Sequence, residues 1–317
     1  MTKKRPDPNT KYRLVTRSDM DGLVCAVLLK KLNLIDDILF AHPKDMQDGT
    51  VDLTDKDITT NLPYNKEVFL CIDHHSSELK RVGEDADNLI IDTKAKSAAR
   101  VVYDYLGGAE KFPHIDVTMM DAVDKADSAG FTKEDIMEPE GWELLSFIMD
   151  SRTGLGRFQD FNISNYQLMM KMIDICLETQ DINKILEIPD VKERVELFNT
   201  HNPKFREQLE RCSHIEDNVV VLDLRKEENI WAGNRFMIYA LFPQASVSIH
   251  VLWGKNKQNT VLAVGKSILN KTSNTQIGDL MLEYGGGGHN AAGTCQIDND
   301  KIETVLEEVT EKIIKSS

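Results

Sequence analysis

The stretch Val68-Phe69-Leu70-Cys71-Ile72-Asp73-His74-His75 is an apolar run that stops at one carboxylate and two imidazoles. Five consecutive apolar residues predict a strand that is buried on both faces. Open α/β sheets bind their ligands at the carboxyl ends of their strands, which is where Asp73, His74 and His75 fall. Oxygen and nitrogen ligands together suit a divalent cation such as manganese. The alternative is that Asp73 caps a turn and that both histidines are solvated.

Length and composition indicate a globular protein. The 317 residues can form one large domain or two of ordinary size, and 41% hydrophobic with 28% charged residues is typical of a soluble protein. No apolar run approaches the roughly 20 residues that a membrane span requires. The polar segment Met1–Pro8 lacks the hydrophobic region of a secretory signal.

The cysteines indicate a reducing compartment. Their number is odd and they lie far apart, and the neighbours of Cys25 and Cys71 are apolar, which predicts buried thiols. We therefore expect a cytoplasmic protein. The five residues are Cys25, Cys71, Cys176, Cys212 and Cys295.

The formal net charge of −14 limits the size of the partner. Binding to long duplex nucleic acid depends on neutralising many phosphates, which an acidic protein does poorly. A small anionic substrate remains compatible, because a metal ion inverts the local field inside a cleft.

A second pair of carboxylates follows the first predicted strand, Tyr12–Thr16. Asp19 and Asp21 lie two residues apart in a strand-to-helix turn, where they can point at the same space, and Gly22 permits a tight backbone there. Helical spacing then runs from Leu23 to Leu32. The alternative is a purely structural turn in which Asp21 caps the helix.

Further strands and helices alternate along the first half of the chain. Strands are expected at Ile38–Ala41 and Leu89–Asp92, and a helix that Ser97 caps is expected to reach Leu106. This alternation predicts a parallel, doubly wound sheet. Between the second strand and the Asp73 strand, Asp55 or Asp57 can project into the same cleft, and we prefer Asp57.

Two regions outside the strands offer further candidates. The helical segment Met119–Asp127 carries Asp124 and Asp127, although most helix carboxylates are solvated. Helices rich in Leu, Ile and Met are expected from about Trp142 to Cys212. The basic loop in that region supplies Arg152 and Arg157, which make it either a phosphate site or an ordinary hinge.

The last hundred residues predict a different kind of sheet. Strands are expected at Val219–Leu222, Arg235–Leu241, Ser246–Trp253 and Thr260–Val264, with helices at Ile277–Tyr284 and Glu303–Ile314. The four glycines Gly285, Gly286, Gly287 and Gly288 precede His289 and an expected helix. Bare backbone N–H groups at a helix start bind anions, although a glycine run is also compatible with a hinge.

Taken in order, Asp19-x-Asp21-Gly22, Asp73-His74-His75 and Gly286-Gly287-Gly288-His289-x-x-Ala292-Gly293 resemble the DHH phosphoesterase superfamily. The resemblance covers nearly the whole chain and is greatest to the exopolyphosphatase-like or oligoribonuclease-like branch. It implies a DHH catalytic domain at 1–150, a helical connector at 151–215 and a smaller DHH-associated, substrate-binding α/β domain with a mixed sheet at 216–317.

The resemblance also implies roles for individual residues. Metal ligands would be Asp19, Asp21, Asp57 as the bridging carboxylate (with Asp55 as its alternative), Asp73, His74 and Asp127 (with Asp124 as its alternative). His75 would contact substrate or bound solvent, and the glycine run with His289 would hold the phosphate or nucleotide end of the substrate. The ions would be manganese or magnesium, one or two per chain.

One position departs from the family pattern. Family members usually carry a histidine just ahead of the first aspartate, whereas this chain has Arg17, with Val15 at the other position. A guanidinium cannot be deprotonated to bind a metal, so one ion loses a ligand. Arg17 is then a candidate for stabilising charge in the transition state.

The function expected on this basis is metal-dependent hydrolysis of a small phosphoester by an enzyme whose histidines and Arg17 act in catalysis. Candidate substrates are a short oligonucleotide, a cyclic or linear dinucleotide, and adenosine bisphosphate. The alternatives are a phosphoanhydride hydrolase such as an exopolyphosphatase, and a nucleotide-binding sensor whose catalysis Arg17 has weakened. Short single-stranded nucleic acid is an expected partner, long duplex DNA and membranes are not, and a homodimer is left open.

Overall fold

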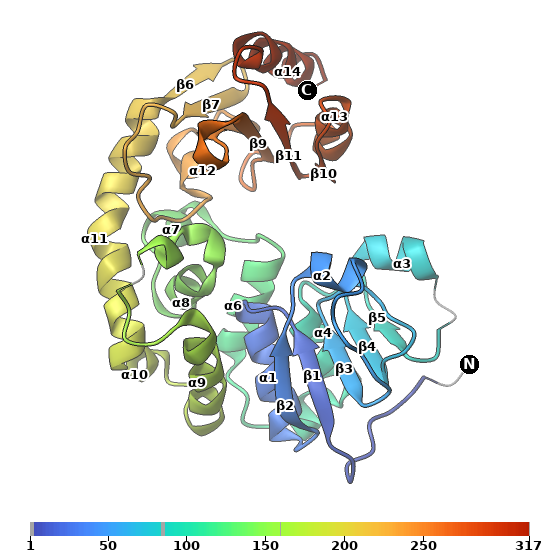
Figure 1. The fold of residues 1–317 in the computed structure, drawn as a ribbon. Helices are drawn as coiled ribbons and strands as arrows, with labels where there is room; N and C mark the ends of the chain where they lie inside the picture. The colour runs from blue at the N-terminus through green and yellow to red at the C-terminus, as the bar shows by residue number, and fades with distance from the viewer. Residues whose placement is uncertain (1–2, 84–85, 159, 317) are drawn as a thin grey trace. The chain divides into compact units, whose positions relative to one another are not determined.

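The protein, seen in a computed structural model that describes residues 3–83, 86–158 and 160–316, divides into two compact units. The first unit comprises residues 1–130, 140–151 and 156–195, and the second comprises 131–139, 152–155 and 196–317. Each unit is built on one sheet (Figure 1). The functional segments expected at 1–150, 151–215 and 216–317 stay a prediction, because compactness alone assigns no function. Within the described residues, no helix is both long and apolar enough to cross a membrane.

The sheet of the first unit has five parallel strands in the order β2-β1-β3-β4-β5. The strands are β1 (Tyr12–Thr16), β2 (Ile35–Phe40), β3 (Asp57–Thr60), β4 (Leu70–Asp73) and β5 (Leu89–Ile91). The winding direction reverses between β1 and β3, which confirms the predicted doubly wound α/β fold. In such sheets the ligand lies outside the carboxyl ends of the strands at this reversal.

Both faces of this sheet are covered, which explains the apolar runs of β4 and β5. Leu14, Leu70 and Ile72 pack in the main core, whereas Val15 and Cys71 face the opposite side. The main core includes side chains of α1 (Met20–Lys31), α4 (Ala98–Tyr105), α6 (Val117–Asp127) and α9 (Asn165–Glu178). Side chains of α2 (Pro43–Gln47) and α3 (Ser76–Val82) pack on the opposite side.

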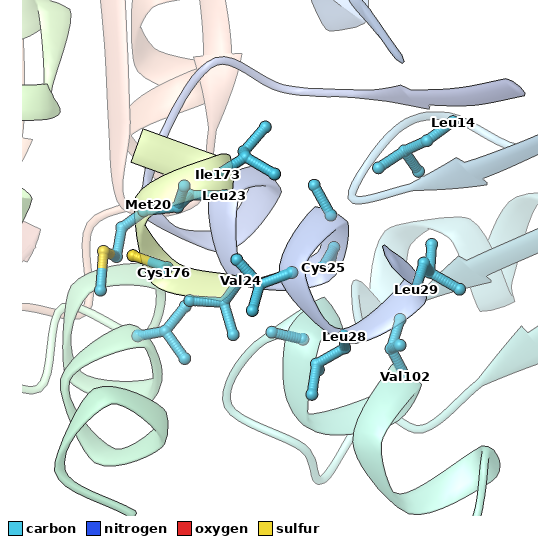
Figure 2. Close-up of a cluster of buried hydrophobic side chains, with 14 of the residues drawn as sticks. Leu14, Met20, Leu23, Val24, Cys25, Leu28, Leu29, Val102, Ile173 and Cys176 are labelled. Carbon is cyan, nitrogen blue, oxygen red and sulfur yellow. The ribbon is translucent and has the colours of Figure 1, made fainter. Parts of the chain in front are cut away.

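Helix α1 lies at the centre of the main core and is buried on nearly every side. Figure 2 shows its apolar side chains beside Val102 of α4 and beside Ile173 and Cys176 of α9. Because close-packed interiors allow little movement, this packing fixes the amino-terminal turn of α1 relative to the sheet. That turn carries Asp19 and Asp21.

In the part of the chain that the structure describes, five further helices and two 3₁₀ turns lie between residues 108 and 212. They are α5 (Gly108–Lys111), α7 (Lys133–Met137), α8 (Gly141–Met149), the 3₁₀ turns η1 (Ser151–Thr153) and η2 (Leu155–Arg157), α10 (Ile182–Leu186) and α11 (Pro189–Cys212). The boundary between the two units falls within α11, between Val195 and Glu196.

The second unit holds a six-stranded sheet in the order β10-β11-β9-β8-β7-β6, in which only β7 and β8 pair in parallel. This confirms the predicted mixed sheet. Helices α13 and α14 pack on one face of it. The elements are β6 (Ser213–Glu216), β7 (Val219–Asp223), α12 (Met237–Leu241), β8 (Val247–Trp253), η3 (Lys255–Lys257), β9 (Thr260–Lys266), α13 (Ile277–Glu283), β10 (Gly287–His289), β11 (Ala292–Ile297) and α14 (Ile302–Ser316).

Two expectations for this unit are wrong. The strand expected at Arg235–Leu241 is helix α12, whose residues Met237–Ala240 are all buried, so the short apolar run has no alternation that separates strand from helix. The helix expected after Gly288 is a hairpin instead, in which β10 pairs with β11 and β11 pairs with β9. Sheet pairing on a neighbouring strand outweighs the helix propensity of the two alanines.

Candidate metal centre

The turn between β1 and α1 brings a carboxylate and a guanidinium together. Asp19 caps α1, because its Oδ1 accepts the N–H of Gly22 at 3.1 Å. A side chain on Gly22 would place its Cβ 1.9 Å from the carbonyl oxygen of Arg17, so only glycine fits this turn. Arg17 Nε lies 3.0 Å from Asp19 Oδ2. Asp19 is therefore already paired with a positive charge.

Asp21 is the most deeply buried carboxylate of this turn, with 2% of its surface exposed. Its two oxygens accept the backbone N–H groups of Ala98 at 3.1 Å and Ala99 at 2.7 Å, at the start of α4. Burial, and then the charges of Asp127 and Asp19, raise the pKa of Asp21 well above its ordinary value despite these hydrogen bonds. The site therefore favours a positive charge close to Asp21.

His74 is oriented as a ligand would be. Its Nδ1 lies 3.3 Å from the carbonyl oxygen of Ala95, and its Nε2 lies 2.6 Å from Asp127 Oδ2. A donated Nδ1–H leaves Nε2 as the atom with a free lone pair, which is the usual arrangement of a metal-binding imidazole. Ligand atoms of Asp21, His74 and Asp127 all lie within 4.8 Å of one another.

His74 and Asp127 also shift each other's pKa. Burial acts to lower the pKa of His74, but the hydrogen bond and charge of Asp127 outweigh it and the pKa is raised. For Asp127, burial acts to raise the pKa, but the hydrogen bond and charge of His74 outweigh it and the pKa is lowered. Each group thus favours the charged form of the other, and a divalent cation bound between them would meet the same two ligand atoms, His74 Nε2 and Asp127 Oδ2.

Asp73 and His75 form a second pair next to the first. Asp73 is 1% exposed, and its Oδ1 lies 2.8 Å from His75 Nδ1. The hydrogen bond to Asp73 raises the pKa of His75 against the opposing effect of burial. The side chain of His75 is 43% exposed, and its ring stacks edge-on against His74 at 4.3 Å between centroids. Asp73 therefore holds His75 with Nδ1 inward, which leaves Nε2 as its second functional atom.

Comparisons with known proteins identify the family. No family model matches the chain, and no curated protein matches it. A solved structure, the pGpG-specific phosphodiesterase PggH from Vibrio cholerae, is 55% identical over 97% of this chain and 100% of that chain, with a TM-score of 0.88. The chain belongs to the DHH phosphoesterase superfamily.

Two more distant structures share the fold. A DHH domain described as a member of a family of ribosomal proteins has a TM-score of 0.53 at 13% identity, over 97% of this chain and 87% of that chain. RecJ from Thermus thermophilus, solved with Mn²⁺, has a TM-score of 0.50 at 13% identity, over 96% of this chain and 52% of that chain. At this identity the likeness concerns the fold alone.

The structure does not bring the expected bridging carboxylate of this DHH protein to the centre. Asp57 is the first residue of β3, at the amino end of the sheet. Its oxygens accept hydrogen bonds from Arg13 Nε at 2.7 Å and Nη2 at 2.8 Å, and from the N–H of Thr54 at 2.6 Å. Asp55 is exposed in the loop before the strand. Both residues lie at the start of β3, whereas the site lies at its other end.

Asn61 is the residue that follows β3 at the carboxyl end, and the sequence interpretation missed it. It is 2% exposed, has a left-handed backbone with φ of 53°, and its Nδ2 lies 3.4 Å from Asp127 Oδ1. The one signal that could have found it is its place after the short run Ile58–Thr60.

The structure separates the two candidates on α6. Asp127, in its last turn, faces His74, Asp21 and Asn61. Asp124 instead accepts hydrogen bonds from Arg100 Nε at 2.9 Å and Nη2 at 2.7 Å, and from Ser97 Oγ at 2.7 Å. Asp124 thus fastens α6 to the start of α4 and points away from the ligand cluster.

The expected substrate-binding residues are distributed over both units. Gly285, Gly286, Gly287, Gly288 and His289 lie in the second unit, before and within β10, and Arg152 belongs to the same unit. Arg157 is an exposed residue of the first unit. A Cβ built on Gly287 would meet no atom within 4 Å, whereas one on Gly288 would lie 2.3 Å from the carbonyl oxygen of Ala292. The fold itself thus requires a glycine at 288 and leaves open space at 287.

Proposed function

We propose that this DHH protein is a divalent-metal-dependent phosphodiesterase, and that its substrate is a short linear dinucleotide of the pGpG type. The observation that carries the proposal is the group of Asp21, His74 and Asp127 at the carboxyl ends of the parallel strands. The 55% identity to a phosphodiesterase named for pGpG supports the substrate class. The net charge of −14 agrees with a small anionic substrate rather than a long duplex.

The donor set fits a manganese or magnesium ion. Two carboxylates and one imidazole are ligands that such ions accept, and the carbonyl of Ala95 orients the imidazole. Asp21 uses one lone pair of each oxygen for the N–H groups of Ala98 and Ala99, which leaves others for an ion. When bound, the ion would lower the pKa of a water ligand and stabilise negative charge on the phosphoryl group.

His75 is the proposed proton carrier. Its Nδ1 contacts the buried carboxylate of Asp73, and its other ring nitrogen, Nε2, is left for a second partner on a half-exposed ring. A histidine oriented by a carboxylate can take a proton from the attacking water or give one to the leaving oxygen. Asp73 would then be a positioning residue, because it acts through His75.

Arg17 is the proposed contact for the scissile phosphate. Its Nε pairs with Asp19, which fixes the guanidinium beside the centre. A guanidinium carries five N–H donors in a planar fork, so a phosphate oxygen can be bound by those that Asp19 does not use. A fixed positive charge there would stabilise the charge that develops in the transition state.

The glycine hairpin, Gly285 to Gly293, is the proposed site for the remote end of the substrate. Gly287 has no side chain in a place where the fold would accept one, so a ligand can approach the backbone N–H there. Arg152, Arg157 and His289 would supply charge and hydrogen bonds to a phosphate or a base. The predicted substrate-binding role of residues 216–317 rests on the glycine run and His289, whereas Arg152 and Arg157 lie outside that range.

The test is a turnover screen of the full chain with Mn²⁺, with Mg²⁺ and with a chelator. The substrates are pGpG, longer oligonucleotides, cyclic dinucleotides, adenosine bisphosphate and polyphosphate. We expect the largest kcat/KM for pGpG and loss of turnover on chelation. Preferred hydrolysis of polyphosphate would favour the phosphoanhydride alternative, and tight pGpG binding without turnover would favour the sensor. Undiminished turnover in the chelator would contradict metal dependence.

The glycine hairpin has a test of its own. Gly287→Val should raise KM for pGpG with little effect on the free energy of unfolding, because its side chain would occupy open space. The control is Gly288→Ala, whose Cβ would collide with the carbonyl of Ala292 and should destabilise the second unit. Unchanged kinetics for Gly287→Val would assign the hairpin to a structural role.

A further inference from the structure

Asn61 combines a left-handed backbone, with φ of 53°, with a buried side-chain oxygen, Oδ1, that has no hydrogen-bond partner among the described residues. Its backbone N–H donates to the carbonyl oxygen of Ile72 at 3.2 Å, and its side-chain Nδ2 lies 3.4 Å from Asp127 Oδ1. Buried polar atoms without a partner are rare and mark strain, a functional role or an absent ion or water. The unpartnered Oδ1 of Asn61 belongs to the same side-chain amide whose Nδ2 contacts the candidate metal ligand Asp127.

The charges of the centre are sufficient for one divalent ion. The carboxylate of Asp19 lies 3.0 Å from Arg17, and that of Asp73 lies 2.8 Å from His75. Asp21 and Asp127 contact backbone N–H groups, an amide and His74 instead. The ligand atoms of these two carboxylates and of His74 lie within 4.8 Å of one another, so the two carboxylates can together balance the charge of one divalent ion. Asp73, His74 and His75 form a second group of possible ligands, but Asp73 already engages His75. A second ion at Asp19 would be repelled by the guanidinium of Arg17.

We propose that this centre holds a single divalent cation, with Asn61 Oδ1 as a neutral ligand beside Asp21, His74 and Asp127. Arg17 takes the place of a second ion and binds the scissile phosphate directly. This inference rests on the proposed function and specifies how that same site is charged. Asn61 stands where a bridging carboxylate would follow β3, and an amide oxygen there satisfies one ion without attracting another.

The measurement is Mn²⁺ binding to the full-length chain, followed by electron paramagnetic resonance and by calorimetric titration. We expect one Mn²⁺ per chain and a spectrum of isolated ions. Asn61→Ala should weaken Mn²⁺ binding by roughly tenfold or more, because a ligand is lost. Unchanged Mn²⁺ affinity in Asn61→Ala would overturn the role of Asn61.

The converse variant combines Arg17→His with Asn61→Asp. It replaces the guanidinium by a neutral imidazole and the amide by a carboxylate, so it should bind a second Mn²⁺. Two manganese ions about 4 Å apart, as in two-metal hydrolases, should give a spin-coupled signal that the unaltered protein lacks. Failure of the double variant to bind more than one ion would overturn the proposal that these two positions set the number of ions.

Asn33→Asp is the matched control. Asn33 is also left-handed, with φ of 55°, and is exposed in the turn between α1 and β2, so the change adds the same charge away from the centre. Its Mn²⁺ stoichiometry should stay at one.

The outcomes separate this inference from the proposed function. Two ions of similar affinity in the unaltered protein, with a coupled signal and active hydrolysis of pGpG, would overturn the single-ion inference alone. No Mn²⁺ binding, together with turnover that a chelator leaves intact, would overturn the proposed metal-dependent function. Arg17→Ala should keep one Mn²⁺ and lose turnover, and full turnover in that variant would overturn the role of Arg17.

Discussion

At the amino end of the parallel sheet, Asp57 is 1% exposed and accepts two hydrogen bonds from Arg13 and two from Thr54. At the carboxyl end, Asp21 is about equally buried, but its nearest charged neighbours include the carboxylates of Asp127 and Asp19. Buried charge is costly unless it is paired, so the first arrangement is complete by itself and the second is not. The difference indicates that burial alone does not distinguish a carboxylate with a structural partner from a candidate ligand, whereas the presence of other carboxylates close to Asp21 does.

The largest expected effect tests the carboxyl end. Asp127→Asn removes one negative charge and one ligand beside His74, so pGpG hydrolysis with Mn²⁺ should fall by ~10³-fold. Steady-state kinetics would measure it, and circular dichroism would check that the fold is intact. Turnover within a few-fold of the unaltered protein would remove Asp127 from the centre.

The matching change at the amino end should affect stability instead. Asp57→Asn leaves the guanidinium of Arg13 without its counter-charge, and we expect the free energy of unfolding to fall by about 1–2 kcal/mol, because Arg13 is partly exposed. Urea denaturation would measure it, and Mn²⁺ titration should give unchanged affinity. Loss of Mn²⁺ binding in this variant would abolish the contrast between the two ends.

Added metal should stabilise only a protein with an intact carboxyl end. Mn²⁺ at about 100 times its dissociation constant should stabilise the first unit by about 2.7 kcal/mol. Trp142 reports on this unit once Trp231 and Trp253 of the second unit are replaced by phenylalanine. Asp57→Asn should keep the increase and Asp127→Asn should lose it. Equal stabilisation of both variants would place the ion elsewhere.

The smallest effect concerns Asp124, one turn before Asp127 on α6. Asp124→Asn weakens an ion pair with Arg100 that is partly exposed, so we expect a loss of about 0.5–1 kcal/mol in stability and unchanged turnover. Urea denaturation and kinetics on one preparation would measure both quantities. A large loss of turnover would show that the two aspartates of α6 act together.

The carboxyl end of a strand in the parallel sheet could be predicted from the sequence wherever an apolar run stops at a charged residue. Tyr12–Thr16 and the run that ends at Asp73 have this form, and the structure confirms both strands and their parallel pairing within one sheet. The position of β3 could not be found in this way. The strand β3 has four residues, all of them buried, and the first is Asp57. From the sequence alone, Asp57 cannot be distinguished from a metal ligand, because its partner Arg13 lies on another strand.

The second unit shows another limit of the sequence pattern. Ala291 and Ala292 after the glycine run suggested a helix, whereas residues 292–297 pair with β9 from Gly265 to Thr260. Pairing with a distant strand is a tertiary effect that local propensity does not contain. The same limit applies to Asn61, whose proposed role depends on the contact between the ends of β3 and α6.

The two hydrogen bonds that Ala98 and Ala99 donate to Asp21 give the centre a natural spectroscopic reporter. These amide protons lie at the first turn of α4 and end on a carboxylate of the centre, so their chemical shifts and exchange with solvent follow its charge. Ligand occupancy can then be read from two backbone amide resonances of an isotopically labelled chain, without turnover. The reporter lies within the first unit, and it would register an ion even in a variant that hydrolyses nothing.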